Sequence, residues 1–221
     1  MTGSDHVALI ELSGGDGLEA RVVGQKASGL VRLAAAGMPV PTGVVVPVSA
    51  GDVDLDRLST DIAARFPAST LAVRSSGVAE DLQGASFAGQ YETVLNVPAR
   101  APDIAAALRR VRASVESAHV AAYRSSVDRS MAVLVMPMVD ADAAGIAFTR
   151  DPVSGEECVV VEAVRGVADR LTAGEADGER WRIGPGAERV MDLRILTAEQ
   201  AVAVADLARR VESHEGTPQE I

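Results

Sequence analysis

The sequence is poor in the residues that build disulfides, metal centres and aromatic cores. Cys158 is the only cysteine, there are three histidines, and aromatic residues make up 3% of the 221 residues. One cysteine excludes an internal disulfide and fits a reducing compartment, and the scattered histidines show no metal-ligand spacing. The core must therefore be built from Val, Leu, Ile and Ala. Cys158 is followed by three valines, so we expect a small buried apolar residue rather than a nucleophile.

Long apolar stretches and an excess of basic residues are also missing. The longest apolar run, residues 131–139, is interrupted by Pro137, whereas a membrane-spanning helix needs about 20 apolar residues. The N-terminus lacks the basic start and apolar stretch of a signal peptide. The net charge of −10, from 21 basic and 31 acidic residues, argues against nucleic-acid binding, which depends on a basic surface. We therefore expect a cytoplasmic protein that binds neither membranes nor nucleic acids.

Apolar periodicity and turn residues predict an α+β chain that forms one large domain or two small lobes. Helices are expected at residues 26–36, 52–66, 102–126 and 197–214, and strands at 7–12, 44–46, 70–74, 91–97, 132–138, 145–149, 158–163 and 181–183. Strands and helices do not alternate strictly, which favours α+β over a doubly wound sheet. If there are two lobes, we expect them at residues 1–130 and 131–221.

Two segments place a cation where a phosphate can bind. Residues 24–30 put Lys26 beside a glycine at a helix start, where a cation and free N–H groups suit an anion. The spacing is not that of a Walker A loop, and a solvated surface lysine is the alternative. Residues 73–77 put Arg74 at a strand end beside two serines, where a guanidinium can contact phosphate oxygens in a bidentate way. A surface ion pair with Glu80 or Asp81 is the alternative there.

Two further segments are candidates for contacts with a nucleotide. Residues 84–93 are rich in small residues and end in Thr93. Small residues allow close backbone approach to a ligand and the movement of a lid, while a plain hairpin loop is the alternative. The strand at residues 133–139 offers backbone groups and methionines to an adenine edge, and an ordinary core strand is the alternative.

In their order and in their residues these segments resemble the N-terminal ATP-binding domain shared by phosphoenolpyruvate synthase, pyruvate phosphate dikinase and rifampicin phosphotransferase. The Gly-Gly-Lys and Gly-x-Pro-Val-Pro-x-Gly motifs of that family are similar to residues 24–26 and 37–43. Its most specific motif is nearly intact at residues 73–93, and later matches stand at 148–152 and 209–221. The resemblance covers essentially the whole chain.

The resemblance implies an ATP-grasp-like fold in which two α+β lobes close on Mg-ATP. It implies that Lys26 and Arg74 hold phosphates, that Gly89 and Thr93 line the nucleotide, and that the strand ending at Met136 carries the adenine contact. In the family reaction the β-phosphate of ATP passes to a histidine on a swivelling domain. The implied partners are therefore ATP, Mg²⁺ and a phosphohistidine domain, on a separate chain or downstream. No residue of this chain is expected to be catalytic or to bind the metal.

The sequence departs from the family pattern at several points. Gly-Gly-Lys is Gly-Gln-Lys at residues 24–26, the glutamine usual in the adenine strand is Met136, and Gly-Leu-Gly-Glu appears only as Gly-Val-Ala-Asp at 166–169. The segment between residues 43 and 74 is shorter than in typical members. The family pattern continues beyond Pro-Gln-Asp-Ile into Glu-Trp and Gln-x-Arg-Pro, which carry metal and phosphate contacts, whereas this chain stops at Ile221. We therefore expect an active site truncated at its C-terminal end.

Three functions remain open at this point. The first is the ATP-binding domain of a dikinase-type phosphotransferase, whose catalysis requires further sequence or a partner chain. The second is a non-catalytic nucleotide-binding or regulatory module derived from that family. The third is a structural remnant that binds no nucleotide. Whether the chain is itself an enzyme is left open, because the chain alone is expected to lack the complete active site. The phosphoryl acceptor is chosen by other domains of the family's enzymes.

Overall fold

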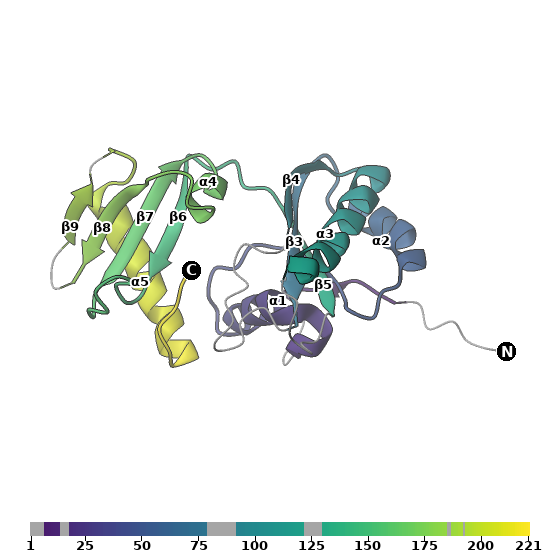
Figure 1. The fold of residues 1–221 in the computed structure, drawn as a ribbon, viewed down its shortest axis with the longest axis horizontal. Helices are drawn as coiled ribbons and strands as arrows, with labels where there is room; N and C mark the ends of the chain where they lie inside the picture. Colours follow the sequence, from purple (N-terminus) through teal and green to yellow (C-terminus); the bar gives the residue numbers. More distant parts are fainter. Residues whose placement is uncertain (1–6, 14–17, 79–91, 122–129, 185–186, 192) are drawn as a thin grey trace. The chain divides into compact units, whose positions relative to one another are not determined.

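The computed structural model describes residues 7–13, 18–78, 92–121, 130–184, 187–191 and 193–221, and of residues 115–121 it describes the backbone alone. The chain divides into two compact units, Met1–Met138 and Val139–Ile221. Each unit is an antiparallel sheet with helices packed against it (Figure 1). The prediction of a mixed α+β chain is thereby confirmed.

The first unit is built on a five-stranded sheet with strand order β1-β2-β5-β3-β4. Its elements are β1 (Ile10–Glu11), α1 (Ala20–Ala35), β2 (Val44–Val46), α2 (Asp52–Arg65), β3 (Thr70–Gly77), β4 (Thr93–Pro98), α3 (Ala101–Ala121) and β5 (Met131–Pro137). All neighbouring strands run antiparallel. A lobe boundary after residue 130 would separate β5 from β2 and β3, the strands with which β5 pairs.

Strand alternation gives the sheet two buried faces, because successive side chains point to opposite sides. Val44, Val73 and Val133 pack against α2 and α3, in one apolar cluster with Leu58 and Leu108. Val45, Leu134 and Met136 pack against α1, in a second cluster with Val23 and Ala27. Figure 1 shows α1 on one side of this sheet and α2 and α3 on the other. The first unit is therefore a three-layer α/β/α arrangement.

The second unit is built on a four-stranded sheet with strand order β6-β7-β8-β9. Its elements are β6 (Ala143–Phe148), β7 (Val159–Arg165), α4 (Asp169–Thr172), β8 (Glu179–Ile183), β9 (Ala187–Met191) and α5 (Ala198–Glu215). Helix α5 packs three alanines onto Val161, Trp181 and their neighbours. The chain then returns beside β6, where Ile221 and Ala147 exchange backbone hydrogen bonds of 2.9 and 3.0 Å.

Residues at both ends of α5 explain where that helix begins and ends. Thr197 Oγ1 accepts from the Gln200 amide at 3.2 Å, and Gln200 Oε1 accepts from the Thr197 amide at 2.8 Å. This reciprocal pair satisfies amides that have no partner within the helix. Gly216 then adopts a left-handed φ of +74° and ends it. The prediction of a helix at residues 197–214 is confirmed to within a residue.

Some elements differ from the expectation. Strand β1 is confined to Ile10–Glu11, α1 begins at Ala20 instead of Lys26, and β3 continues through both serines to Gly77. Strand β9 and the single-turn α4 were not anticipated, because neither has an apolar period of its own. Among the helices that the structure describes, none combines the length and apolar character needed to cross a bilayer.

Candidate functional site

Helix α1 changes direction at Gly24, where β3 approaches too closely for any larger residue. Gly24 has φ +75° and ψ 166° inside α1, a region of backbone space that is essentially restricted to glycine. A Cβ at Gly24 would lie 1.9 Å from the carbonyl oxygen of Ser76. The glycine of the Gly-Gln-Lys motif is therefore explained by close approach of α1 to the end of β3.

The hydroxyl of Ser76 joins the two sides of this bend. Ser76 is fully buried; its Oγ donates to the Val23 carbonyl at 2.8 Å and accepts from the Ala27 amide at 3.1 Å. Both partners belong to α1 and lie on either side of Gly24. The sequence places this hydroxyl beside Arg74, but the structure uses it to hold α1 against β3.

The bend brings Lys26 to the end of β3. Lys26 Nζ donates to the Ser75 carbonyl at 3.1 Å, and the lysine is half-buried. Arg74 precedes Ser75 on the same strand, and its half-buried side chain has a buried Nε that finds no hydrogen-bond partner among the described residues. Lys26, which is predicted to hold phosphates, is thus bonded to the residue that follows Arg74 in β3, although the two cations lie 48 residues apart in sequence (74 − 26).

Strand register places Thr93 and Met136 on the same face as Arg74. Arg74 lies opposite Thr93 on β4 and opposite Leu134 on β5. Residues directly opposite in an antiparallel pair project to one face, and Leu134 packs in the cluster beneath α1. Met136, opposite Ala72, belongs to that cluster too. The α1 face of the sheet therefore carries Arg74, Thr93 and Met136.

These predicted residues differ in what they expose. Thr93 is exposed, whereas the side chain of Met136 is 8% exposed and packed in the core. Its Cγ would lie 2.7 Å from a Cβ added to Gly43, which shows how closely the strands pack there. Gly89, and the possible ion-pair partners Glu80 and Asp81, lie outside the described residues.

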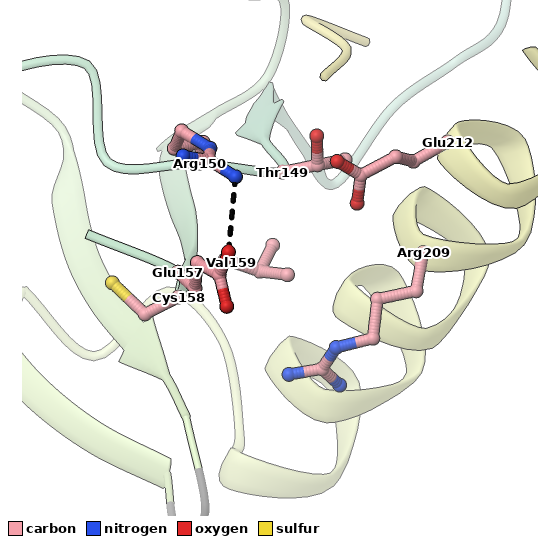
Figure 2. A pocket seen from close by; sticks show the side chains of 7 residues that line it. All are labelled: Thr149, Arg150, Glu157, Cys158, Val159, Arg209 and Glu212. Atoms are coloured by element: carbon pink, nitrogen blue, oxygen red, sulfur yellow. Dashed lines mark hydrogen bonds and ion pairs between the residues drawn. The ribbon is translucent and has the colours of Figure 1, made fainter. Parts of the chain in front are cut away.

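The second unit contains a pocket between the end of β6, the start of β7 and α5 (Figure 2). Its volume is about 290 Å³, and it is lined by Thr149, Arg150, Glu157, Cys158, Val159, Arg209 and Glu212. Arg150 pairs with Glu157 at 3.2 Å, and Arg209 pairs with Asp206 at 3.1 Å. The two arginines that line this pocket are therefore already paired with carboxylates of the same unit.

Cys158 is less buried than expected, because it lines this pocket. Its side chain is half-buried, and Arg182 Nη2 donates to the sulfur at 3.5 Å. Arg182 also reaches Asp151, at 3.6 Å. Asp151 accepts from the amides of Ser154 and Val153 at 3.0 and 2.8 Å, and these bonds lower the pKa of its carboxyl. The Arg-Asp-Pro segment, matched to the family at residues 148–152, is thus a turn closed by the Asp151 side chain.

The buried carboxylate of Glu179, at the start of β8, holds the segment that leads into α5. Glu179 is inaccessible to solvent and accepts from Trp181 Nε1 at 2.7 Å and from the amides of Leu193, Ile195 and Leu196 at 3.1, 2.9 and 3.0 Å. Burial raises the pKa of this carboxyl, but the four hydrogen bonds together outweigh burial and lower the pKa to about 2. These hydrogen bonds occupy the carboxylate oxygens of Glu179 within the protein, so Glu179 has a structural role. This role was not predicted from the sequence.

Within the part of the chain that the structure describes, no group of three or more His, Cys, Asp or Glu side chains is arranged to hold a metal ion. Lys26 and Arg74 are cations of the kind that bind anions such as phosphate.

Comparison with known families identifies the chain. Residues 52–220 match the pyruvate phosphate dikinase AMP/ATP-binding domain. The chain belongs to this family. The prediction of a dikinase-type ATP-binding domain is thereby confirmed. Arg74, Thr93 and Met136 fall within the matched residues of the AMP/ATP-binding domain, and Lys26 precedes them.

Individual relatives of this AMP/ATP-binding domain are much longer than the chain. A probable phosphoenolpyruvate synthase of Methanothermobacter thermautotrophicus is 31% identical over 183 residues, covering 68% of this chain and 27% of the relative. A rifampicin phosphotransferase of a Streptomyces species is 36% identical over 186 residues, covering 69% of this chain and 21% of the relative. An uncharacterized phosphotransferase of Bacillus subtilis, YvkC, is 24% identical over 261 residues, covering 91% of this chain and 31% of the relative.

One solved structure is similar to a large part of the chain. It is the dinucleotide-forming acetyl-coenzyme A synthetase of Ca. Korarchaeum cryptofilum, with 13% identity, a TM-score of 0.39, and coverage of 85% of this chain and 66% of that chain. A TM-score this low decides nothing about the fold.

Proposed function

We propose that the first unit binds the phosphates of ATP through Lys26 and Arg74. The observation that carries this proposal is the arrangement at the end of β3. There the buried Nε of Arg74 finds no hydrogen-bond partner among the described residues, and the carbonyl of the next residue, Ser75, receives Lys26 Nζ. A buried polar group without a partner costs about 1–3 kcal/mol. A bound phosphate oxygen removes that cost, since a guanidinium and an ammonium are the groups that bind phosphate best.

The rest of the nucleotide is assigned by the family and by register. We propose that Thr93 contacts the phosphates from β4, because it is exposed and lies opposite Arg74. Gly89 belongs to the same contact segment. The adenine contact comes from the backbone near the end of β5, since the side chain of Met136 is buried beneath α1. This arrangement uses local cations in a protein whose net charge is −10, so attraction of ATP depends on these few groups and not on the whole surface.

We further propose that the two units adopt an ATP-grasp-like fold and serve a dikinase-type phosphotransferase. In that role Mg²⁺ arrives bound to the phosphates of ATP. A histidine on another domain or chain receives the phosphoryl group. Lys26 and Arg74 then hold the transferred phosphates in line and offset their charge.

A second candidate function is a nucleotide-binding module without catalysis. The departures from the family pattern at Met136 and at residues 166–169 favour it. The two functions differ in their dependence on Mg²⁺, because a phosphotransferase stabilises transferred phosphates through the metal. Binding that is equally tight with and without Mg²⁺ points to the second function.

Isothermal titration calorimetry with ATP, ADP and adenosine, each with and without Mg²⁺, tests these proposals. We expect ATP to bind more tightly than adenosine, and Lys26→Ala and Arg74→Ala each to weaken ATP binding by about 1.5–3 kcal/mol. Adenosine binding should stay within about 0.5 kcal/mol of the unsubstituted protein, because the proposal assigns both cations to the phosphates and adenosine has none.

Arg109→Ala is the matched control for Arg74→Ala. Arg109 is an exposed arginine of α3 paired with Asp56 at 2.7 Å, on the opposite face of the sheet from Arg74. We expect its removal to leave ATP affinity unchanged. The absence of ATP binding at millimolar concentration would refute the proposed function, and unchanged affinity in both Lys26→Ala and Arg74→Ala would refute the site.

A further inference from the structure

Ser76 occupies an unusual position for a strand residue, because its hydroxyl enters the hydrogen-bond ladder of a helix. In a continuous α-helix the Ala27 amide donates to the Val23 carbonyl, four residues earlier. Here Ser76 Oγ accepts from the Ala27 amide at 3.1 Å and donates to the Val23 carbonyl at 2.8 Å. A side chain inserted between such partners is one of the recognised causes of a helix bend. We call this pair of bonds the Ser76 bridge.

The Ser76 bridge fixes the segment that carries Lys26. Lys26 lies between the two residues that the hydroxyl holds, Val23 and Ala27. Gly24, in the same span, has a φ of +75° and touches the backbone of Ser76. The turn from Val23 to Ala27 is therefore held to β3 by one hydroxyl and one close backbone contact.

Three consecutive residues of β3 then act on the same small region. Arg74 contributes its guanidinium, the Ser75 carbonyl receives Lys26 Nζ at 3.1 Å, and Ser76 anchors the backbone on both sides of Lys26. Both hydrogen bonds of the Ser76 hydroxyl are made within the protein. The hydroxyl therefore acts on the ligand through Lys26 and does not contact the ligand. Cations held in place before binding lose less conformational freedom when the ligand arrives.

We infer that Ser76 is a positioning residue for the nucleotide phosphates, which sets the distance between Lys26 and Arg74 through the Ser76 bridge. This inference rests on the proposed function, in which those two cations bind ATP. It predicts that the effect of Ser76 on ATP binding passes through Lys26. A residue that merely stabilises the fold would have no such dependence.

A double-mutant cycle separates the two roles. ATP affinity is measured for the unsubstituted protein, Ser76→Ala, Lys26→Ala and the double variant. We expect Ser76→Ala to weaken ATP binding about three- to tenfold in the unsubstituted protein. In the Lys26→Ala background the same change should alter affinity by less than about 1.5-fold, because the cation that it positions is gone. Equal losses in both backgrounds, or no loss in either, would overturn the inference.

Ser59→Ala is the matched control. Ser59 is also buried, at 1% exposure, and its hydroxyl donates to the Asp56 carbonyl at 2.8 Å in α2, on the opposite face of the sheet. It should lower the melting temperature much as Ser76→Ala does and leave ATP affinity unchanged. If Ser76→Ala does not fold, Ser76→Cys, with a similar size and a weaker hydrogen bond, replaces it and should show a smaller loss with the same dependence on Lys26.

A direct measurement of Lys26 keeps the inference distinct from the proposed function. Lys26 is the only lysine in the sequence, so reductive ¹³C-methylation labels one side chain, besides the N-terminal amine, for NMR. Without ATP, Ser76→Ala should move and sharpen the Lys26 signal, while Ser59→Ala leaves it in place. A protein that binds no ATP refutes the proposed function, whereas a Lys26 signal indifferent to Ser76→Ala refutes the positioning role.

Discussion

Arg74 and Thr93 lie directly opposite each other in the antiparallel pair of β3 and β4, and both project to the face of the sheet that α1 covers. Arg74 lies within β3, the strand that α1 touches, and Thr93 is the first residue of β4, at the end of the segment that resembles the family's nucleotide loop. A charged and a hydroxyl donor are thus presented side by side from adjacent strands. Substitutions at these two positions should separate the effect of charge from that of hydrogen bonding.

Arg74→Lys should weaken ATP binding by about 1 kcal/mol, which is less than the loss in Arg74→Ala. Lysine keeps the positive charge but loses the planar fork that binds two phosphate oxygens at once. Calorimetric titration with ATP measures the difference. Arg109→Lys is the control, since Arg109 pairs with Asp56 at the surface, and an equal loss in that variant would contradict a specific role for Arg74.

Thr93→Val should weaken ATP binding about two- to fivefold without changing stability by more than about 0.5 kcal/mol. Valine keeps the β-branched shape that suits a strand and removes only the hydroxyl of an exposed residue. Urea unfolding measures the stability and calorimetry the affinity. A large drop in stability with unaltered affinity would show that Thr93 is a structural residue of β4.

Gly24→Ala should destabilise the first unit by more than about 2 kcal/mol. The substitution meets two obstacles, a φ of +75° and a Cβ 1.9 Å from the Ser76 carbonyl, and backbone strain by itself costs about 1–3 kcal/mol. Gly37→Ala is the matched control, because Gly37 has a φ of +71° but nothing within 4 Å of its added Cβ. The difference between the two variants in thermal unfolding isolates the cost of the clash. Equal losses would mean that α1 shifts away from β3 without cost.

The second unit should lose stability as the pH falls from about 5 to about 2. The pKa of Glu179 is lowered from 4.5 to about 2 in the folded protein. Its contribution is therefore complete above the unfolded pKa of 4.5 and is lost as the pH falls through the folded pKa. Fluorescence of Trp181, the only tryptophan, reports unfolding of the second unit, and urea midpoints at pH 7, 4 and 2.5 measure the loss.

Glu179→Gln should lower the stability of the second unit at pH 7 and flatten its dependence on pH in that window. The amide lacks the charge and part of the acceptor capacity that three backbone amides and Trp181 require. Glu157→Gln is the control, because the side chain of Glu157 is 85% exposed. A pH dependence of Glu179→Gln as steep as that of the unsubstituted protein would assign the acid sensitivity to other carboxylates.

The long helices with apolar periodicity were predictable from sequence, whereas the contacts between distant segments were not. Helix α5 is predicted by its apolar spacing and by Thr197 and Gln200 at its start. The sequence also predicts that Lys26 and Arg74 bind phosphate, but only the fold shows that Lys26 bonds to the residue that follows Arg74 in β3. The roles of Ser76 and Glu179 could not be predicted, because both depend on partners brought from distant segments or loops. A serine in a strand and a glutamate at a strand start look like surface residues until their partners are placed.

Because the two faces of β3 contact different partners, the number of residues in this strand before Arg74 must be kept. Leu71 and Val73 fill the core beneath α2 and α3, whereas Ala72, Arg74 and Ser76 face α1. Inserting or deleting one residue within the strand would exchange these sets. The guanidinium would then enter an apolar core, and a valine would take the place of the cation. Changes in length are therefore tolerable only in the connections that flank β3. The strand itself can evolve by substitution alone.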